Sequence, residues 1–173
     1  MGEAQRWQIR DACPADAEVL AAAQRAIAQI PGRLASTPGE LPDQAFRDRI
    51  DRLSRMDCGT FIVITEDGDI VGHALLDPLK LHVTAHVVDL TIAVHEGHQG
   101  RGHGKRLLSH LIDWARSNPN IERIELRVRS ENTRAIALYQ ALGFIEEGRM
   151  RKRIKLGPGR YVDDVVMGLW VGA

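Results

Sequence analysis

Cysteine is scarce in this sequence, with only Cys13 and Cys58 among its 173 residues. Two thiols are too few for the disulfide framework that stabilises many small secreted proteins, so they favour a reducing cytoplasm. No apolar run approaches the ~18 residues of a transmembrane helix. The first seven residues lack the apolar core of a signal peptide, and Arg6 stands where a myristoylated chain carries Ser or Thr after Gly2. We therefore expect a cytoplasmic protein without a membrane partner.

The sequence also lacks an excess of either charge. Its 23 Lys and Arg residues balance its 23 Asp and Glu residues, so no strong net field favours nucleic acid as a partner. Internal repeats, low-complexity tracts and linkers are absent as well. A length of 173 residues suits one domain with a proper core, and we expect residues 1–173 to form that domain.

Hydrophobic periodicity predicts both strands and helices. Strict alternation over residues 121–129 indicates a half-buried strand, and two apolar runs joined at Asp67-Gly68 indicate a hairpin. The predicted strands are Trp7–Arg10, Phe61–Thr65, Ile70–Leu76, His86–Val94, Ile121–Arg129, Phe144–Leu156 and Tyr161–Val171. The predicted helices run from Asp11 or Pro14 to Ile30, from Asp43 to Met56, through Leu107 and Ala115, and from Thr133 to Leu142.

The strongest chemical signal is a glycine-rich turn between an apolar run and an amphipathic helix. Gly100, Gly102 and Gly104 would let the backbone approach a ligand closely. The first N–H groups of the following helix lack partners within it, and the helix dipole places partial positive charge at the same end. Arg101 and Lys105 add full charges. The pattern predicts a site for a phosphate or pyrophosphate.

The glycine spacing distinguishes between phosphate-binding motifs. Gly100 to Gly104 is one residue too short for Gly-x-x-x-x-Gly-Lys-Ser/Thr, and the run does not continue as Gly-x-Gly-x-x-Gly. The segment Gln99-Gly-Arg-Gly102-His-Gly104 does match Gln/Arg-x-x-Gly-x-Gly/Ala. It therefore resembles the pyrophosphate loop of the GNAT superfamily of acyl-CoA N-acyltransferases.

A second segment is similar to the same superfamily. Asn132-Thr-Arg-Ala-Ile-Ala-Leu-Tyr139-Gln-Ala-Leu-Gly-Phe144 resembles its Asn-x-x-Ala-x-x-Leu-Tyr-x-x-x-Gly-Phe pattern. On a helix, Asn132 and Tyr139 lie two turns apart on nearly the same face. The resemblance is strong over residues 60–171 and weak before them. It implies an α/β fold, with a mixed, mostly antiparallel, twisted sheet of about seven strands and helices on both faces.

The resemblance also implies acetyl-CoA as the co-substrate. The loop would hold its pyrophosphate, and Asn132 would bond the pantetheine or phosphate arm. The strand His86–Val94 would splay from the next strand near Val94, which frees backbone groups for the pantetheine and the thioester carbonyl. Tyr139 would lie near the CoA sulfur, where a phenol with a pKa of about 10 can protonate a thiolate whose conjugate acid lies near 8.5. The expected cofactor-binding residues are Ile92, Ala93, Val94, Gln99, Gly100, Arg101, Gly102, His103, Gly104, Lys105, Asn132, Ala135 and Tyr139.

The general base that accepts the proton of the amine is left open between two carboxylates. Asp89 and Glu125 each lie on a strand face that could meet the acceptor cleft. Glu125 could instead form a surface ion pair with Arg123 or Arg127, and Asp89 could be a satisfied polar residue at a sheet edge. Together with Tyr139, these two acids are the candidate catalytic residues.

Two further segments indicate the acceptor. Arg123-Ile-Glu-Leu-Arg-Val128 and Tyr161-Val-Asp-Asp-Val-Val-Met167 resemble small bacterial acetyltransferases that act on amino acids or phosphinothricin-like amines. Ribosomal-protein N-terminal acetyltransferases are a neighbouring group, but they carry a Glu base where this sequence has Arg127. We therefore expect N-acetylation of a primary amine of a small molecule such as an amino acid. The alternatives are a protein N-terminal acetyltransferase and a non-catalytic acyl-CoA-binding regulatory module.

Four histidines near the loop raise the question of a metal. His95, His98, His103 and His110 are close in sequence, yet two of them fall inside the phosphate turn, and no ligand pattern of Cys or carboxylate accompanies them. We expect no metal site.

The closing hairpin offers apolar side chains for contact with a second copy. These are Tyr161, Val165, Met167 and Trp170. Because many members of the superfamily are homodimers, the resemblance together with these residues predicts a homodimer.

Overall fold

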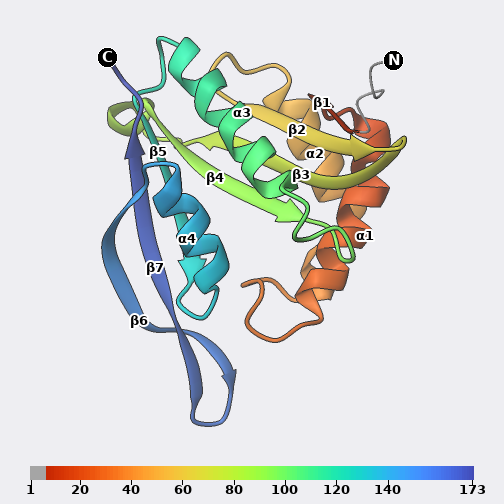
Figure 1. Ribbon diagram of the computed structural model, residues 1–173, viewed down its shortest axis with the longest axis vertical. Helices are drawn as coiled ribbons and strands as arrows, with labels where there is room; N and C mark the ends of the chain where they lie inside the picture. Colours follow the sequence, from red (N-terminus) through yellow and green to blue (C-terminus); the bar gives the residue numbers. More distant parts are fainter. Residues whose placement is uncertain (1–6) are drawn as a thin grey trace.

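A single seven-stranded sheet forms the centre of the computed structural model, which describes residues 7–173 (Figure 1). The strands are β1 (Trp7–Asp11), β2 (Thr60–Glu66), β3 (Asp69–Pro78), β4 (Val87–Val94), β5 (Arg123–Arg129), β6 (Ile145–Gly157) and β7 (Arg160–Trp170). Their order across the sheet is β1-β2-β3-β4-β5-β7-β6. Neighbouring strands pair antiparallel except β4 and β5, which run parallel. The predicted mixed, mostly antiparallel sheet is confirmed.

Helices cover both faces of the sheet, as predicted. They are α1 (Ala17–Ala28), α2 (Asp43–Leu53), α3 (His103–Ser117) and α4 (Thr133–Ala141), with short 3-10 helices at Pro14–Asp16, Pro38–Glu40 and His82–Thr84. Figure 1 shows α3 and α4 in front of the sheet, with α1 and α2 on the opposite side. Within the described residues, no helix is long and apolar enough to cross a membrane.

The first helix begins later than the sequence predicts. Residues 14–16 form a 3-10 turn, and α1 starts at Ala17 rather than at Asp11 or Pro14. The cause is local, because the Asp16 carboxylate accepts a hydrogen bond of 2.8 Å from the backbone N–H of Cys13 and pairs with Arg10. These contacts satisfy polar groups at the turn, so residues 14–16 do not need α-helical hydrogen bonds. The first two α-helices also end earlier than predicted, at Ala28 and Leu53.

Each face of the sheet has its own apolar core. On one face Leu107 and Leu111 of α3 are fully buried together with strand residues such as Ile124. On the other face Phe46 and Ile50 of α2 pack in the second cluster with α1 and strands β2 and β3. Burying such a side chain is worth about 1.5–3 kcal/mol. The two cores therefore hold helices from distant parts of the chain against opposite faces of one sheet.

The parallel strands β4 and β5 stay together over only part of their length. Their pairing covers Val87, Val88 and Asp89 of β4, opposite residues 123–125 of β5. Beyond Asp89 the two strands separate, although β4 continues to Val94. The predicted splay is therefore present but begins nearer the start of β4 than expected. It opens the sheet between the two helix layers.

The β6–β7 hairpin corrects part of the predicted dimer surface. Val165 and Met167 are completely buried in the core under α3 and α4, so they are not available to a second copy. Tyr161 and Trp170 are 43% and 56% exposed. The exposed residues lie at the ends of β7, whereas the middle of this strand is buried between β5 and β6, and the prediction did not separate the two regions.

Candidate functional site

The glycine-rich loop has the geometry of an anion site. Gly100 and Gly102 adopt φ values of 85° and 84°, a region that side chains disfavour and glycine permits. Gly102 is the N-cap of α3 and supplies no side chain to the free N–H groups, and the first turn holds no acidic residue. Within residues 7–173, the backbone N–H groups of 103–105 take part in no hydrogen bond. These donors and the helix dipole fit a pyrophosphate.

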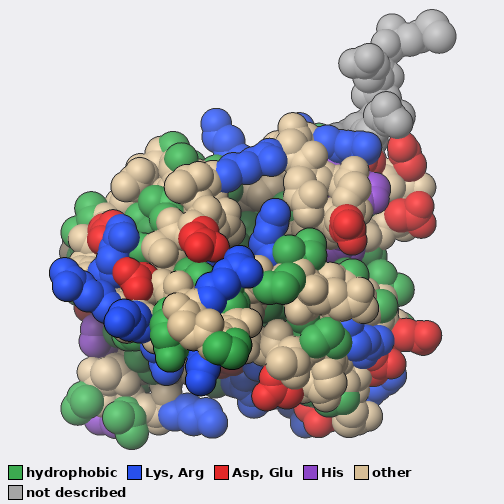
Figure 2. All heavy atoms as spheres, turned by 90° about the horizontal axis from the view of Figure 1, so that it is seen from below, with side chains coloured by type: hydrophobic (Ala, Val, Ile, Leu, Met, Phe, Trp, Pro, Cys, Tyr) green, Lys and Arg blue, Asp and Glu red, His purple; other side chains and the backbone are tan. Residues whose placement is uncertain are grey.

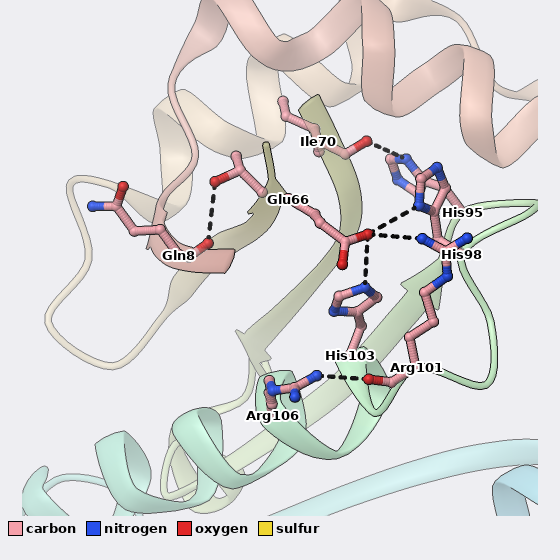
Figure 3. Close-up of polar contacts among 9 residues, drawn as sticks. Gln8, Glu66, Ile70, His95, His98, Arg101, His103 and Arg106 are labelled. Carbon is pink, nitrogen blue, oxygen red and sulfur yellow. Dashed lines mark hydrogen bonds and ion pairs between the residues drawn. The ribbon is translucent and has the colours of Figure 1, made fainter. Parts of the chain in front are cut away.

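The side chains of Arg101 and His103, which were expected to bind the cofactor, point toward Glu66. Arg101 Nη1 lies 3.0 Å from Glu66 Oε2, and the same oxygen lies 3.6 Å from His103 Nε2 and 3.7 Å from His98 Nδ1. Figure 3 shows the three side chains converging on the Glu66 carboxylate. The imidazole of His103 is 2% exposed, so this residue can serve an anion only through its backbone. The ion pair between Glu66 and Arg101 thus ties β2 to the loop, a role of Glu66 that the sequence did not indicate.

Two further side chains at the loop, Gln99 and Arg106, have local partners. Gln99 Nε2 donates to the carbonyl of Val94 at 3.3 Å. This carbonyl, which was expected to be free for the cofactor, therefore already accepts one hydrogen bond. Arg106 donates to the Arg101 carbonyl at 2.7 Å and lies 4.7 Å from the centre of the Trp7 ring. Lys105 lines an open hollow of about 820 Å³ between α3 and β1. Hydrogen bonds from its own side chains therefore stabilise the conformation of the loop. Its positive charge comes mainly from the backbone N–H groups and from exposed basic side chains.

The second motif forms the start and body of α4. The Asn132 side chain caps the helix by accepting a hydrogen bond of 3.2 Å from the N–H of Ala135, which leaves its amide donors free. Tyr139 is 7% exposed, and its ring lies 5.7 Å from that of Phe144. Burial raises the pKa of Tyr139 to about 12, so the hydroxyl keeps its proton at neutral pH.

One cavity of about 390 Å³ lies where β4 and β5 separate. It brings together side chains from both helix layers and from the loop between α1 and α2. The lining includes Gln24, Phe46, Leu90, Thr91, Ile92, Val128, Asn132 and Tyr139. Asn132 and Tyr139 are thus joined in one site, as the sequence predicts, together with Ile92 of the expected backbone segment.

The same cavity is rich in arginine. Arg33, Arg49, Arg127 and Arg129 line it, whereas Glu40 is the one acidic residue among the described lining residues. Arg129 pairs with Asp164 across β5 and β7. The side chains of the other three arginines form no hydrogen bond or ion pair within residues 7–173, although Arg49 and Arg127 interact electrostatically with Asp89. In Figure 2, which looks at the end of the molecule that carries the β6–β7 turn and the α1–α2 loop, Lys and Arg side chains are spread over the left and the middle.

The two candidate bases lie beside the cavity rather than in its wall. Asp77, Asp89 and Glu125 stand opposite one another on adjacent strands, so all three carboxylates share one sheet face with Thr91 and Arg127. Burial raises the pKa of Asp89, and the positive charge of Arg127 partly offsets this effect. Glu125 Oε2 lies 3.5 Å from Arg123 Nε, the ion pair that the sequence offered as its alternative role.

Beneath the cavity lies a buried chain of hydrogen bonds that the sequence did not indicate. Gln24 Nε2 lies 3.2 Å from His73 Nε2, and His73 Nδ1 lies 3.0 Å from His95 Nε2. His95 Nδ1 lies 3.1 Å from the Ile70 carbonyl oxygen, a contact visible in Figure 3. Burial lowers the pKa of His73 to about 3 and that of His95 to about 4, so both rings are neutral at pH 7.

These two histidines predict a loss of stability in mild acid. In the unfolded chain each ring binds a proton below pH 6.5, whereas the folded protein binds it only near pH 3–4. Between those values the unfolded state holds more protons, so the free energy of unfolding falls as the pH falls, by up to about 1.4 kcal/mol per pH unit for each histidine. Urea denaturation from pH 7.5 to 4.5 should show a shallower fall for a His95→Gln variant. His110→Gln, at an exposed position, should keep the wild-type slope, and equal slopes for all three proteins would contradict the assignment.

No metal centre is evident in the part of the chain that the structure describes. Residues 7–173 hold no group of three or more His, Cys, Asp or Glu side chains that could bind a metal ion. The histidines that raised the question divide between the Glu66 cluster, the buried chain and an exposed position on α3.

Comparison with known proteins agrees with the geometry. The sequence profile of the Acetyltransferase (GNAT) family matches residues 28–144. The chain is 35% identical to the L-amino acid N-acetyltransferase AaaT of Escherichia coli (strain K12) over 106 residues, or 61% of this chain and 65% of that protein. It is 33% identical to the L-amino acid N-acyltransferase MnaT of the same strain over 109 residues, or 62% of each chain. The chain thus spans less than two thirds of the length of these relatives.

A solved structure extends the similarity over the whole fold. The GCN5-related N-acetyltransferase from Kribbella flavida superposes with a TM-score of 0.85 at 28% sequence identity. The superposition covers 96% of this chain and 98% of that protein. The superposition therefore extends well beyond residues 28–144, which the family profile matches.

Proposed function

The chain belongs to the acetyltransferase (GNAT) family, and from this premise we propose that it transfers the acetyl group of acetyl-CoA to the primary amine of a small molecule that also carries a carboxylate. An amino acid is the simplest such molecule. The names of the relatives AaaT and MnaT support this substrate class, as does the cavity described above.

The observation that carries the proposal is the meeting of Tyr139 with three unpaired arginines in one cavity. Arg33, Arg49 and Arg127 come from the α1–α2 loop, from α2 and from β5. A guanidinium binds a carboxylate through two parallel hydrogen bonds, and its charge repels a polycationic amine. The cavity therefore favours an amine with a carboxylate over a polyamine.

The other residues divide the remaining tasks. Acetyl-CoA supplies an acyl group activated as a thioester. The N-terminus of α3 and the glycines of its loop would hold the pyrophosphate, and the free amide donors of Asn132 would bind a polar group of the pantetheine arm. Tyr139 keeps its proton at neutral pH and is the group that would donate it to a leaving thiolate.

Of the two candidate bases, we favour Asp89. Burial raises its pKa toward the range in which a carboxylate accepts a proton effectively, while Glu125 is engaged with Arg123. Because Asp89 lies beside the cavity wall, proton transfer would run through a water molecule. Asp89→Asn should lower the single-turnover rate at pH 7 at least tenfold. Glu125→Gln is the matched control and should stay within threefold of wild type. The reverse order of the two effects would transfer the role to Glu125.

A panel of acceptors tests the function itself. Each amine is incubated with acetyl-CoA, CoA release is followed, and the product is identified by mass. Amino acids should be acetylated at least tenfold faster than their carboxamides, and spermidine should be a poor acceptor. Acetylation of peptide N-termini alone would favour a protein N-terminal acetyltransferase. CoA binding without transfer to any acceptor would favour a regulatory module.

The quaternary structure and location belong to the same proposal. We propose a homodimer built on the β6–β7 hairpin, where Ile145, Met150, Tyr161 and Trp170 are all between 39% and 64% exposed. The unpaired Cys13 and Cys58 support a reducing cytoplasm. Light scattering at micromolar concentration should give twice the chain mass, and Trp170→Lys should shift it toward the monomer. A monomer mass for the wild type would reject the dimer.

A further inference from the structure

The buried chain of hydrogen bonds starts at a carbonyl, and this fixes the direction of every bond in it. A backbone carbonyl only accepts, so His95 Nδ1 must carry a hydrogen and donate to the Ile70 oxygen. A neutral ring carries one N–H, so His95 Nε2 is an acceptor and His73 Nδ1 must donate to it. His73 Nε2 is then bare. Gln24 can satisfy it only through its NH₂ group.

The orientation of the Gln24 carboxamide is therefore set by two rings beneath it. Gln24 is 8% exposed and lines the cavity, and its NH₂ group is held at His73. Within residues 7–173 its carbonyl oxygen Oε1 accepts no hydrogen bond, and this oxygen is not among the side-chain atoms that are closed off from solvent. The carboxamide of Gln24 therefore has a used NH₂ group and an unused oxygen at the wall of the cavity. This oxygen can accept a hydrogen bond from a ligand bound in the cavity.

The cavity otherwise offers little to a cationic amine. Its charged lining is dominated by arginines, which bind an anionic group and repel an ammonium. Glu40, the acidic residue of the lining, already accepts hydrogen bonds from the backbone N–H and the hydroxyl of Thr37. An acceptor that carries both an ammonium and a carboxylate needs a neutral oxygen for its N–H groups, because a carboxylate there would compete for the arginines.

We propose that Gln24 Oε1 binds the amino group of the acceptor, and that His73 and His95 are positioning residues that keep this oxygen, rather than the NH₂ group, turned to the cavity. The inference rests on the proposed acetyl transfer to a carboxylate-bearing amine. It adds a binding residue for the amine and a reason for two buried polar rings in an apolar core. A flipped carboxamide would present N–H donors to an ammonium and would reject it.

Binding of the acceptor separates this role from a structural one. Calorimetry in the absence of acetyl-CoA measures the Kd of the best amino acid found in the acceptor panel. Gln24→Met keeps the side-chain length but deletes the acceptor, and it should raise this Kd and the KM about tenfold, the loss of one hydrogen bond to a charged group. Gln24→Glu keeps an acceptor oxygen but adds a charge that would attract the arginines of the cavity, so it should not return the Kd to the wild-type value. A wild-type Kd in Gln24→Glu would contradict the need for a neutral oxygen. Gln29→Met, at an exposed position at the end of the same helix, is the matched control and should change nothing.

Nuclear magnetic resonance of the imidazole nitrogens tests the chain itself. Both His73 and His95 should show a protonated Nδ1 and a bare Nε2 at pH 7. In Gln24→Glu, His73 should gain a proton at higher pH than in wild type, because a carboxylate then faces its bare nitrogen. Protonated Nε2 atoms in the wild type, or an unchanged amine Kd in Gln24→Met, would overturn the inference. Failure of the wild type to acetylate any amine would instead reject the proposed function.

Discussion

Replacing Tyr139 by Phe should slow acetyl transfer by ~10²–10⁴-fold, the usual range for a positioned proton donor. Phe keeps the ring and its packing against Phe144 but removes the hydroxyl. Burial holds the pKa of Tyr139 near 12, so wild type carries the proton across the physiological range and the variant has nothing to replace it. Single-turnover transfer is the decisive measurement, because steady-state rates can report product release.

The controls for this variant follow from the same geometry. CoA affinity and the free energy of unfolding should change little, because neither the loop at α3 nor the apolar contacts of the ring are altered. A thioester donor whose thiol has a lower pKa needs less help from an acid, so it should partly restore the rate. A variant within threefold of wild type in single turnover would leave Tyr139 as a packing residue of the core.

The sequence could predict the parts of this protein that depend on local patterns. Strict alternation over residues 121–129 identified β5, because one face of this strand is buried in the core while the other is partly exposed. The predicted start of the last helix at Thr133 is confirmed, because Asn132 caps it by accepting a hydrogen bond from the backbone N–H three residues on. The glycine-rich turn likewise predicted a free helix N-terminus, and the structure adds that Gly100 and Gly102 have positive φ.

The walls of the cavity could not be predicted in the same way. Arg33, Arg49 and Arg127 lie in a loop, a helix and a strand, and each has the surroundings of an ordinary surface residue in the sequence. Their convergence depends on how α1 and α2 pack against the sheet, which is a property of the whole fold. His73 was hidden for a related reason, since it occupies an inward position of an otherwise apolar strand and meets Gln24 only after folding.

Changing the glycine loop should abolish most of the affinity for CoA. In the double variant Gly102→Val/Gly104→Val, the backbone of Gly102 at φ 84° disfavours a branched side chain, and the side chain added at Gly104 enters the space beside Val94 and Leu138. The first N–H groups of α3 would then no longer converge on one anion. Losing two hydrogen bonds to a charged group at about 1.5 kcal/mol each predicts a Kd for CoA that is about 100-fold higher.

Backbone strain alone must be separated from loss of the anion site. Gly97 has nearly the same backbone conformation, φ 81°, and an added Cβ there meets nothing within 4 Å among the described residues. Gly97→Val therefore imposes comparable strain in the same turn without blocking the approach to α3. Calorimetry should give the control a Kd within threefold of wild type, with circular dichroism confirming that both variants are folded. The double variant blocks the N-terminus of α3, whereas Gly97→Val does not. If both bind CoA equally tightly, the pyrophosphate does not lie at the N-terminus of α3.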